Sequence, residues 1–223
     1  MKKIISLLLA LACAFALFSC GGDDQNPDIA AFANILADSE PTKIVTNTSY
    51  NDGDNTLVGT FETQIFGSDF VMEYNYQTYP EPSAGMDPDA YIVDVPGTVY
   101  YHDGLYSTDK GATWGSAAPD TAAMGAKINL DSKLIKSYSV SSDKKMLTVS
   151  VDGETAEQIL GMSLSASDDK VRIIINHDGN NIRSILVMYT TVNEATVQLS
   201  TSYSYSEVVS PFESQDGAES DAQ

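Results

Sequence analysis

The feature that most constrains the fold is a series of β-rich runs separated by short turns. Aspartate–glycine pairs stand at Asp52-Gly53, Asp103-Gly104 and Asp178-Gly179, each between runs rich in β-branched and aromatic residues. The tightest hairpin turns need a positive φ at both central residues, which aspartate and glycine tolerate. The sequence therefore predicts a mainly antiparallel β protein whose neighbouring strands are joined by hairpins.

The same turn residues mark where the expected strands begin and end. We predict them over residues 43–51, 56–66, 70–79, 135–141, 146–151, 170–176, 182–191 and 195–205. The last three are long and separated by short turns, so they form an antiparallel meander. The first two of these are apolar at both odd and even positions, at residues 173–175 and 185–188, which is typical of a sheet that is covered rather than wet on one side, whereas the third alternates as expected nearer an edge.

Two short helices are expected beside this sheet. Residues 28–37 place Ile29, Phe32, Ala33 and Leu36 on one face at helical spacing, and residues 154–160 form a second helix that ends at Gly161. Little helix against so much strand predicts an α+β, mostly β fold. We expect a strongly curved antiparallel sheet, a half-barrel, with one or two helices covering its concave face.

The N-terminus has the pattern of an export sequence. Lys2 and Lys3 precede an apolar run over residues 4–18, which is too short for a comfortable membrane span. The following Leu17-Phe18-Ser19-Cys20-Gly21 resembles a bacterial lipobox, although Phe18 is bulkier than usual. The resemblance implies a lipoprotein signal peptide over residues 1–19 and a diacylglyceryl anchor on Cys20. An ordinary secretory signal is the alternative. Both place the protein outside the cytoplasm, and the anchor would hold it on a bacterial membrane.

The remaining chain is expected to form one domain. Residues 20–27 read as a flexible tether, 28–212 as a single half-barrel domain and 213–223 as a disordered acidic tail. The chain has 31 acidic and 12 basic residues, a net charge of −19. Such a surface repels nucleic acid and anionic head groups, so membrane attachment must come from the acyl chains rather than a basic patch.

One short motif is specific enough to test. The stretch from Ser107 to Trp114, STDKGATW, resembles the Asp-box turn of sialidase-type β-propellers. It occurs once, the nearest second copy at residues 141–145 lacks the glycine, and a propeller needs more strands than this chain holds. We therefore interpret it as a structural turn. Asp109 would accept bonds from following amides, Gly111 would allow a left-handed backbone, and Trp114 would pack on the hairpin.

The order of elements resembles that of another group. The hairpin over Tyr100–Trp114, the segment Ile128–Gly161 and the closing aromatic strand are similar to the LolA-like and LppX-like bacterial lipoproteins. That resemblance spans most of residues 28–213. It implies an unclosed β-barrel whose mouth is plugged by helices, and a hollow in which members of the group carry or sense acyl chains.

The resemblance leads to a ligand hypothesis. Candidate lining residues are the apolar and aromatic side chains expected on the inner wall: Phe32, Leu36, Met72, Tyr74, Ile173, Ile175, Ile185 and Met188. Plain core packing is the competing interpretation of each. The alternative function is a cell-surface interaction or scaffold lipoprotein that uses residues 79–90 and tyrosines such as Tyr203 and Tyr205, with a protein partner still unknown.

Chemical motifs are lacking in the sequence. It contains no nucleophile elbow, zinc-protease motif or phosphate-binding glycine loop, so we expect a binding protein without cofactor or metal rather than an enzyme. A hydrolase built on the Asp-box is kept as an outlier. His102 and His177 each precede an aspartate–glycine turn and are expected to be solvated. Residues 51–55 carry oxygen ligands but lack the length of a calcium loop.

Overall fold

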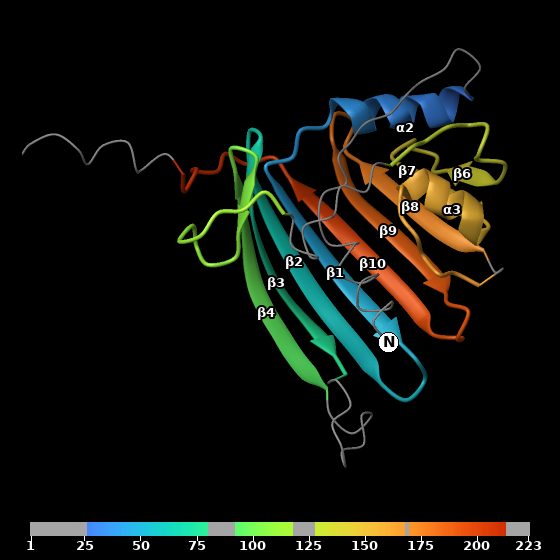
Figure 1. Ribbon diagram of the computed structural model, residues 1–223. Helices are drawn as coiled ribbons and strands as arrows, with labels where there is room; N and C mark the ends of the chain where they lie inside the picture. Colours follow the sequence, from blue (N-terminus) through green and yellow to red (C-terminus); the bar gives the residue numbers. More distant parts are fainter. Residues whose placement is uncertain (1–25, 80–91, 118–127, 168–169, 213–223) are drawn as a thin grey trace, which may run out of the picture.

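The protein is described from a computed structural model that covers residues 26–79, 92–117, 128–167 and 170–212. In these ranges it forms two helices and one ten-stranded sheet (Figure 1). The helices are α2 (Pro27–Asp38) and α3 (Gly153–Leu160). The strands are β1 (Lys43–Asn51), β2 (Thr56–Phe66), β3 (Asp69–Thr78), β4 (Val93–His102), β5 (Leu105–Ser107), β6 (Tyr138–Val140), β7 (Met146–Val151), β8 (Val171–His177), β9 (Ile182–Thr190) and β10 (Thr196–Ser204).

The sheet is built from two meanders joined by the first and last long strands. Its order is β5-β4-β3-β2-β1-β10-β9-β8-β7-β6, and every neighbouring pair is antiparallel. Strand β1 pairs with β10 from Lys43↔Ser204 to Asn51↔Thr196. The sheet is strongly curved and does not close into a barrel (Figure 1). The predicted fold class, α+β and mostly β with a curved antiparallel sheet, is therefore confirmed.

The predicted elements lie close to the observed ones. Strands β1, β2 and β7 have the expected bounds, and both helices begin one residue earlier than expected. The strand expected over residues 135–141 is shorter, because only Tyr138–Val140 pairs with β7. The predicted signal peptide, Cys20 and the acidic tail lie outside the described residues, as do residues 80–90 of the predicted interaction loop.

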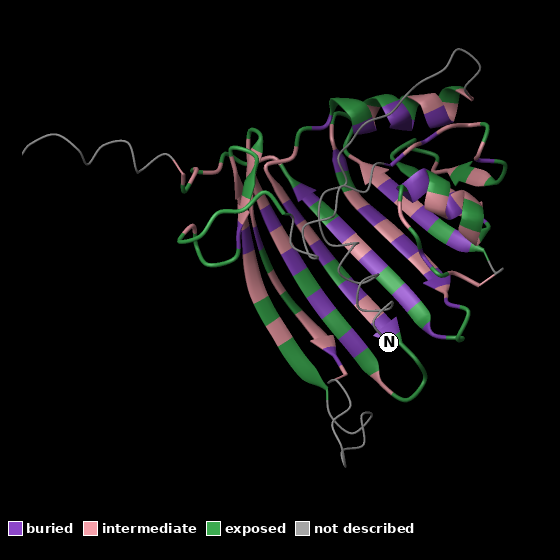
Figure 2. Ribbon diagram, in the orientation of Figure 1, coloured by how far each residue is buried: buried purple, intermediate pink, exposed green. Residues whose placement is uncertain are grey.

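The main core lies between the two helices and the inner face of the sheet, which we define as the face that carries the buried strand residues. Along strands such as β1 and β10, buried residues alternate with more exposed ones, because successive side chains point to opposite faces (Figure 2). The first cluster joins the buried face of both helices to the strand residues beneath them. Its members include Ile29, Phe32, Ala33, Leu36, Leu147, Ala156, Ile159, Leu160, Ile173, Ile175, Ile185, Val187 and Leu199.

Helix α2 is held at both of its ends. Asn26 caps its start by accepting a bond from the Asp28 amide, and Pro27 occupies the first turn, where no amide donor is needed. At the other end the buried Ser39 hydroxyl donates to the Ile35 carbonyl at 2.7 Å and accepts from the Ile182 amide at 3.0 Å. This serine fastens the helix to the first residue of β9.

Helix α3 is a short, fully capped element. Asp152 accepts from the Thr155 amide at 2.8 Å, and Gly161 ends the helix in the left-handed region with φ 66°. The preceding segment is attached to it, since the Asn129 amide donates to the Ile159 carbonyl. Ile128 and Leu130 are buried in the first cluster, so this segment extends the core beside α3. Neither described helix is long and apolar enough to span a bilayer.

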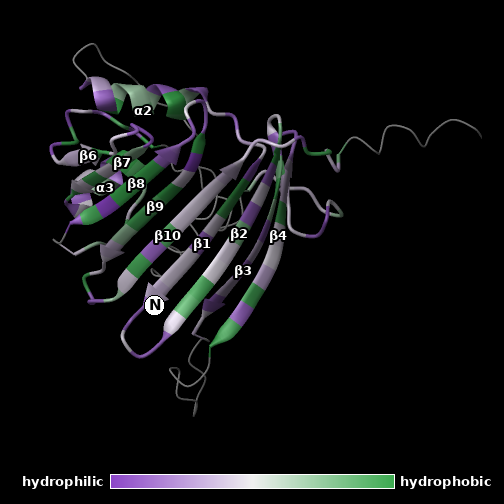
Figure 3. Cartoon of the chain, turned by 180° about the vertical axis from the view of Figure 1, so that it is seen from behind, coloured by the Kyte–Doolittle hydropathy of each residue, from purple (hydrophilic) through white to green (hydrophobic). Residues whose placement is uncertain are grey.

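The outer face of the sheet is more polar than the inner face. Strands β1 and β10 are largely pale in Figure 3, where serine and threonine lie near the middle of the hydropathy scale, and asparagine and glutamine also occupy outward positions of these strands. Ile174, Leu186 and Met188 form a half-buried apolar row across β8 and β9. The sequence predicted that the apolar runs 173–175 and 185–188 would be covered on both faces of the sheet. Their side chains are fully buried only on the inner face.

The chain after β10 crosses back toward the opposite half of the sheet. The Thr42 hydroxyl contacts the carbonyls of Ser204 and Ser206, and Phe212 reaches His102 at the end of β4. The rings of Phe212 and His102 stack with centroids 4.6 Å apart, and Phe66 meets Phe212 edge-on. The end of the described chain is therefore attached to the meander that contains β1 to β5.

Replacement of Ser39 by alanine tests how α2 is attached. The substitution leaves the buried Ile182 amide without its acceptor, which costs about 1–3 kcal/mol of unfolding free energy. Chemical denaturation measures the change, and Ser206→Ala, at an exposed position, is the matched control with an expected change within about 0.5 kcal/mol. A Ser39→Ala protein as stable as the control would show that this bond does not hold the helix.

Candidate functional site

A second apolar cluster lies on the inner face of β2, β3 and β4, which we call the aromatic half. Phe61, Met72 and Val99 are its buried centre, and the partly buried residues around them are Phe70, Tyr74, Tyr76 and Tyr106. All the buried residues of α2 and α3 belong to the first cluster and none to the second. In the described parts of the chain, the two helices therefore cover only one half of the inner face.

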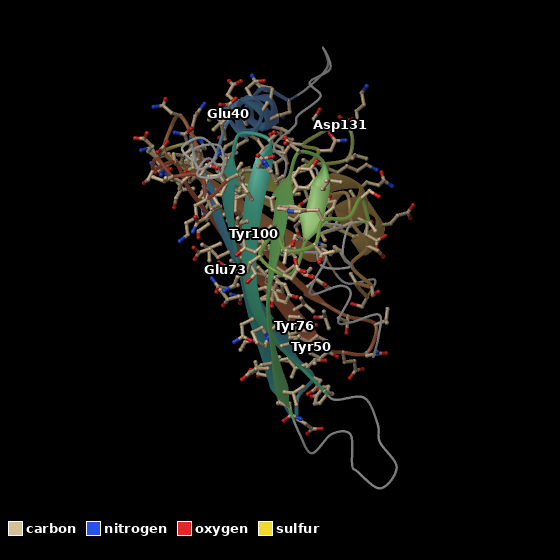
Figure 4. The ribbon with its side chains drawn as sticks, turned by 60° about the vertical axis from the view of Figure 1, so that its left-hand side comes forward. Glu40, Tyr50, Glu73, Tyr76, Tyr100 and Asp131 are labelled. Atoms are coloured by element: carbon tan, nitrogen blue, oxygen red, sulfur yellow. The ribbon has the colours of Figure 1, made fainter. Side chains whose placement is uncertain are left out.

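The register explains how these rings meet. Phe61 pairs with Tyr74 across β2 and β3, and Tyr76 follows two residues further along the same face. Phe61 lies 6.1 Å from Tyr74 and 6.2 Å from Tyr76 between ring centroids, with interplanar angles of 25° and 10°. In Figure 4, Tyr50 and Tyr76 project to one side of the sheet, whereas Glu73 and Tyr100 project to the other. The rings thus form a nearly parallel wall.

Two glycines allow the rings to lie flat on the sheet. A β-carbon on Gly97 would lie 2.1 Å from the Tyr74 hydroxyl oxygen, since the Tyr74 ring crosses that position. A β-carbon on Gly59 would lie 2.7 Å from the Thr48 hydroxyl and 3.1 Å from the Phe61 ring. Glycine in a strand often marks such a close approach. Both positions therefore belong to the aromatic half.

A band of threonines separates the aromatic half from the main core. Thr46, Thr48, Thr63 and Thr201 are all buried on the inner face of β1, β2 and β10. The Thr46 and Thr201 hydroxyls lie 3.0 Å apart, and the Thr48 hydroxyl is 3.5 Å from the Gly59 carbonyl oxygen. The inner face therefore has an aliphatic part, a hydroxyl band and an aromatic part in sequence across the sheet.

The same face is electrically neutral. In the described strands, the positions that share the inner face with the buried residues carry no aspartate, glutamate, lysine or arginine. Lys43 and Arg172 are at the alternate, outward positions, and Arg183 is the exposed residue skipped where the register of β8 and β9 shifts. An apolar surface with a few neutral hydroxyls suits an uncharged ligand better than an ionic one.

The structure divides the predicted lining residues into three groups. Phe32, Leu36, Ile173, Ile175 and Ile185 are buried together in the first cluster beneath the helices. Met72 and Tyr74 lie in the aromatic half. Met188 lies on the outer face, because Val187 and Tyr189 occupy the inward positions on either side of it, so it cannot line the concave surface. The eight residues do not form one site.

Sequence reasoning missed Phe61, Tyr76 and Val99. The period-two pattern Leu57, Gly59, Phe61, Thr63 indicates one face of a strand, and so does Met72, Tyr74, Tyr76. The pattern does not say which strands are covered by helices, so it could not distinguish these residues from ordinary core.

The Asp-box motif forms a self-contained turn beside β5. The Ser107 hydroxyl donates to the Asp109 carboxylate at 2.7 Å and accepts from the Gly111 amide, and Asp109 also accepts from the Thr113 amide at 2.8 Å. Gly111 has φ 82°, and a β-carbon there would lie 3.1 Å from the Trp114 ring. Chiefly because of the Ser107 bond, the pKa of Asp109 falls to about 2. A surface pocket of about 270 Å³ adjoins the turn and is lined in part by Tyr106 and Trp114.

The second, imperfect copy repeats this chemistry. The Ser141 hydroxyl donates to Asp143, and both side chains accept from the Lys145 amide. Lys144 and Lys110, at the same place in each turn, both have positive φ. Because the motif closes a turn at two separate sites, its bonds are sufficiently explained by local backbone geometry.

Both histidines have partners, and the His102 side chain is also 37% exposed. The His177 ring contacts the Lys144 carbonyl at 2.9 Å and meets the Phe32 ring edge-on. His102 Nδ1 lies 2.7 Å from Asp69 Oδ2, and its Nε2 lies 3.6 Å from Asp103. The Asp69 bond raises the pKa of His102, with Asp103 adding to the effect. Asp69, His102 and Asp103 each bring one possible ligand atom to within 4.8 Å of the others, and the contacts between them are those of an ion pair.

In the oxygen-rich turn at residues 51–55, the side-chain oxygens of Asn51 and Asp52 accept hydrogen bonds from nearby groups of the protein. Asp52 accepts from the amides of Asp54 and Asn55 and from the Tyr79 hydroxyl, and these bonds lower its pKa. Asn51 accepts from the Gly53 amide. The turn is therefore explained by its hairpin geometry.

Comparison with known proteins gives no family for this chain, since no family model and no curated protein matches it. The functional assignment therefore depends on the geometry of the inner face.

The His102 ion pair predicts a defined response to pH. Because the folded pKa of His102 is raised above 6.5, its contribution to stability is complete below about pH 6.5 and disappears as the pH rises through the folded value. Titration of the imidazole C–H signals by NMR should show a lower pKa in Asp69→Asn. Asp103→Asn is the control with a smaller decrease, because Asp103 is farther away and 85% exposed. Equal decreases would contradict the assignment of Asp69 as the main partner.

Proposed function

We propose that this protein is a lipid-anchored extracytoplasmic lipoprotein that binds an acyl chain or another apolar ligand on the aromatic half of its sheet. The proposal rests on one observation. The inner face is divided into two apolar clusters, and the two helices contribute buried residues only to the first of them. The second cluster contains nearly parallel aromatic rings, and Gly59 and Gly97 leave room for these rings to lie against the sheet. Binding sites for small ligands combine such apolar walls with a few placed polar groups.

The anchor is proposed from the sequence alone. The apolar run before Cys20 and the lipobox-like residues 17–21 support acylation of that cysteine. The resemblance to LolA-like and LppX-like lipoproteins agrees with both parts of the proposal, because an unclosed sheet with helices over one face is what that resemblance implies. The net charge of −19 disfavours attachment through anionic head groups and favours a covalent anchor.

Binding rather than catalysis is the proposed role. The inner face of the described strands carries neither a carboxylate nor a cation, so it offers no acid–base pair. The Asp-box carboxylate that a hydrolase would use is committed to Ser107 and Thr113, and its pKa of about 2 makes it a weak base. We propose a structural role for this turn.

A surface-interaction role is the second candidate. Tyr203 is buried and the Tyr205 hydroxyl donates to the Ile182 carbonyl at 2.6 Å, so these two tyrosines do not form a docking patch. Trp114, in contrast, is 36% exposed beside the pocket at the Asp-box turn. That residue is where a protein or glycan partner would be sought first.

The anchor can be tested with the two cysteines of the chain. Cys20→Ala should abolish incorporation of labelled palmitate by the full-length protein in a bacterial host and release it from the membrane fraction. Cys13→Ala is the matched control and should remain labelled, because it lies within the predicted signal peptide. Unlabelled wild-type protein that is secreted would identify the ordinary secretory signal instead.

The ligand surface can be tested with one strand of the sheet. Val95 shares the inner face with Val99 and pairs with Tyr76, whereas Thr98 faces outward on the same strand. Val95→Lys should weaken binding of the neutral fluorophore diphenylhexatriene by about tenfold, since a charge on this surface must be desolvated. Thr98→Lys adds the same charge and should leave the affinity unchanged.

Protein with Cys20 replaced by serine is used for these titrations, so that no acyl anchor competes for the site. Thermal unfolding of each variant separates a loss of binding from a loss of folding. Wild-type protein that does not bind the fluorophore, or two lysine variants with the same affinity, would overturn the proposed ligand surface.

A further inference from the structure

We infer that His102 and Asp103 bind a divalent transition-metal ion such as Zn²⁺, and that Asp69 positions both of these ligands. The site lies at the turn between β4 and β5, and none of its three residues belongs to the two apolar clusters. Its basis is a short sequence that occurs twice. His-Asp-Gly stands at residues 102–104 and again at residues 177–179, and the structure gives the two copies different partners.

In the copy at residues 177–179, the possible ligand atoms are already engaged. His177 Nε2 lies 2.9 Å from the Lys144 carbonyl oxygen, and its Nδ1 is enclosed by the protein. The Asp178 carboxylate accepts bonds from two backbone amides of its own turn and from the Arg183 guanidinium. This copy is therefore explained by its own hairpin and offers no ligands to an ion.

In the copy at residues 102–104, one imidazole nitrogen and one carboxylate are left for an ion. His102 Nε2 lies 3.6 Å from a carboxylate oxygen of Asp103, which is too far for a hydrogen bond. Neither group makes another side-chain hydrogen bond within the ranges that the structure describes, apart from the bond of His102 Nδ1 to Asp69. The two side chains are 37% and 85% exposed, so ions from solution can reach them. The net charge of −19 attracts cations to such a surface.

The spacing of these two ligand atoms suits a single metal ion. Zinc binds an imidazole nitrogen or a carboxylate oxygen at about 2.0–2.2 Å, so two such ligands at a tetrahedral angle are about 3.4 Å apart. The observed separation of 3.6 Å is close to that value, and water would complete the coordination. An imidazole ligand favours zinc, copper or nickel, whereas calcium and magnesium take oxygen ligands.

The other imidazole nitrogen has the partner that is typical of a metal-binding histidine. His102 Nδ1 lies 2.7 Å from Asp69 Oδ2, and because a carboxylate only accepts, the proton is on Nδ1 and the lone pair of the neutral ring is on Nε2. Asp69 Oδ1 also accepts from the Asp103 amide at 3.3 Å, so one carboxylate orients both ligands. The ring itself stacks on Phe212, which limits its rotation.

Titration with Zn²⁺ alone tests the inference. The full chain is used with Cys13→Ser and Cys20→Ser and without a histidine tag, so that no thiol or tag competes for the metal. The chain has two histidines, so the NMR signals of their imidazole C–H groups report the two copies separately. We expect Zn²⁺ to shift the signals of His102 and to leave those of His177 in place.

A paramagnetic ion tests where the metal lies. Trp114 is the only tryptophan of the chain, and its ring centroid is 6.1 Å from that of His102. Co²⁺ in the site should therefore broaden the indole N–H signal of Trp114. In His102→Gln this broadening should disappear, whereas in His177→Gln it should persist, because the second copy has no free ligands.

Variants of the aspartates separate the ligand from the positioning residue. Asp103→Asn should weaken Zn²⁺ binding at least about tenfold, and Asp178→Asn, in the second copy, is the matched control with unchanged affinity. Asp69→Ala should weaken binding by about 10- to 100-fold, the usual effect of losing such a partner. Asp69→Asn keeps an acceptor for Nδ1 and should weaken it less. Thermal unfolding without metal checks that each variant is folded.

Three results would overturn the metal site and leave the ion pair as the role of these residues. They are unshifted His102 signals at every Zn²⁺ concentration at which the protein stays soluble, an equal response to Ca²⁺, and equal losses of affinity in Asp103→Asn and Asp178→Asn. None of these results bears on the proposed apolar ligand surface, which is tested separately with the fluorophore.

Discussion

The ladder between β1 and β10 is the interaction on which the rest of the structure depends. It pairs nine residues of the first strand with nine of the last, and it is the contact that joins two otherwise local meanders into one sheet. Because side chains alternate with a period of two, a shift of one residue here would turn every inward residue of one meander outward. The hydroxyl contact between Thr46 and Thr201 lies in this seam, so the polar band depends directly on the register.

The curved sheet and the few helices together divide the inner face. Helix α2 is fixed to β9 through Ser39, and α3 is followed by the chain that leads into β8, so both helices pack on the same meander. Twelve and eight residues of helix are too few to cover ten strands. The inner face of the other meander is covered in part by its own aromatic side chains. These rings lie against the sheet where β2 and β4 have glycines. This half therefore has a small core of its own, centred on Phe61, Met72 and Val99.

The polar side chains of the described loops mostly serve the loops themselves. Aspartates 52, 109, 143, 152 and 178 each accept bonds from nearby backbone amides, and each has a lowered pKa. The main cause is the hydroxyl of Ser107 at Asp109 and of Ser141 at Asp143, and it is the backbone amides at the other three. The abundance of acid in this chain is thus partly a consequence of many tight turns. In the described part of the chain, charge is kept to the outer face and the loops, while the inward strand positions are neutral.

Local physics determined most of the secondary structure. Aspartate–glycine turns, period-two alternation and caps such as Gly161 operate over a few residues, so they could be read from the sequence, and strands 43–51, 56–66 and 146–151 were placed correctly. The curvature class and the two helices also followed from composition and order. Inward or outward orientation was harder where apolar residues run consecutively, which is why Met188 was placed on the wrong face.

Only the tertiary structure decided which part of the inner face the two helices cover. The pairing of β1 with β10 joins residues 145 to 161 positions apart, and no local pattern encodes that choice. The same holds for the placement of both helices over one meander, which put Phe32, Leu36, Ile173, Ile175 and Ile185 into packed core and left Phe61 and Tyr76 beside the threonine band. Burial is a property of what packs on a residue from afar, and the sequence specifies it only through the whole fold.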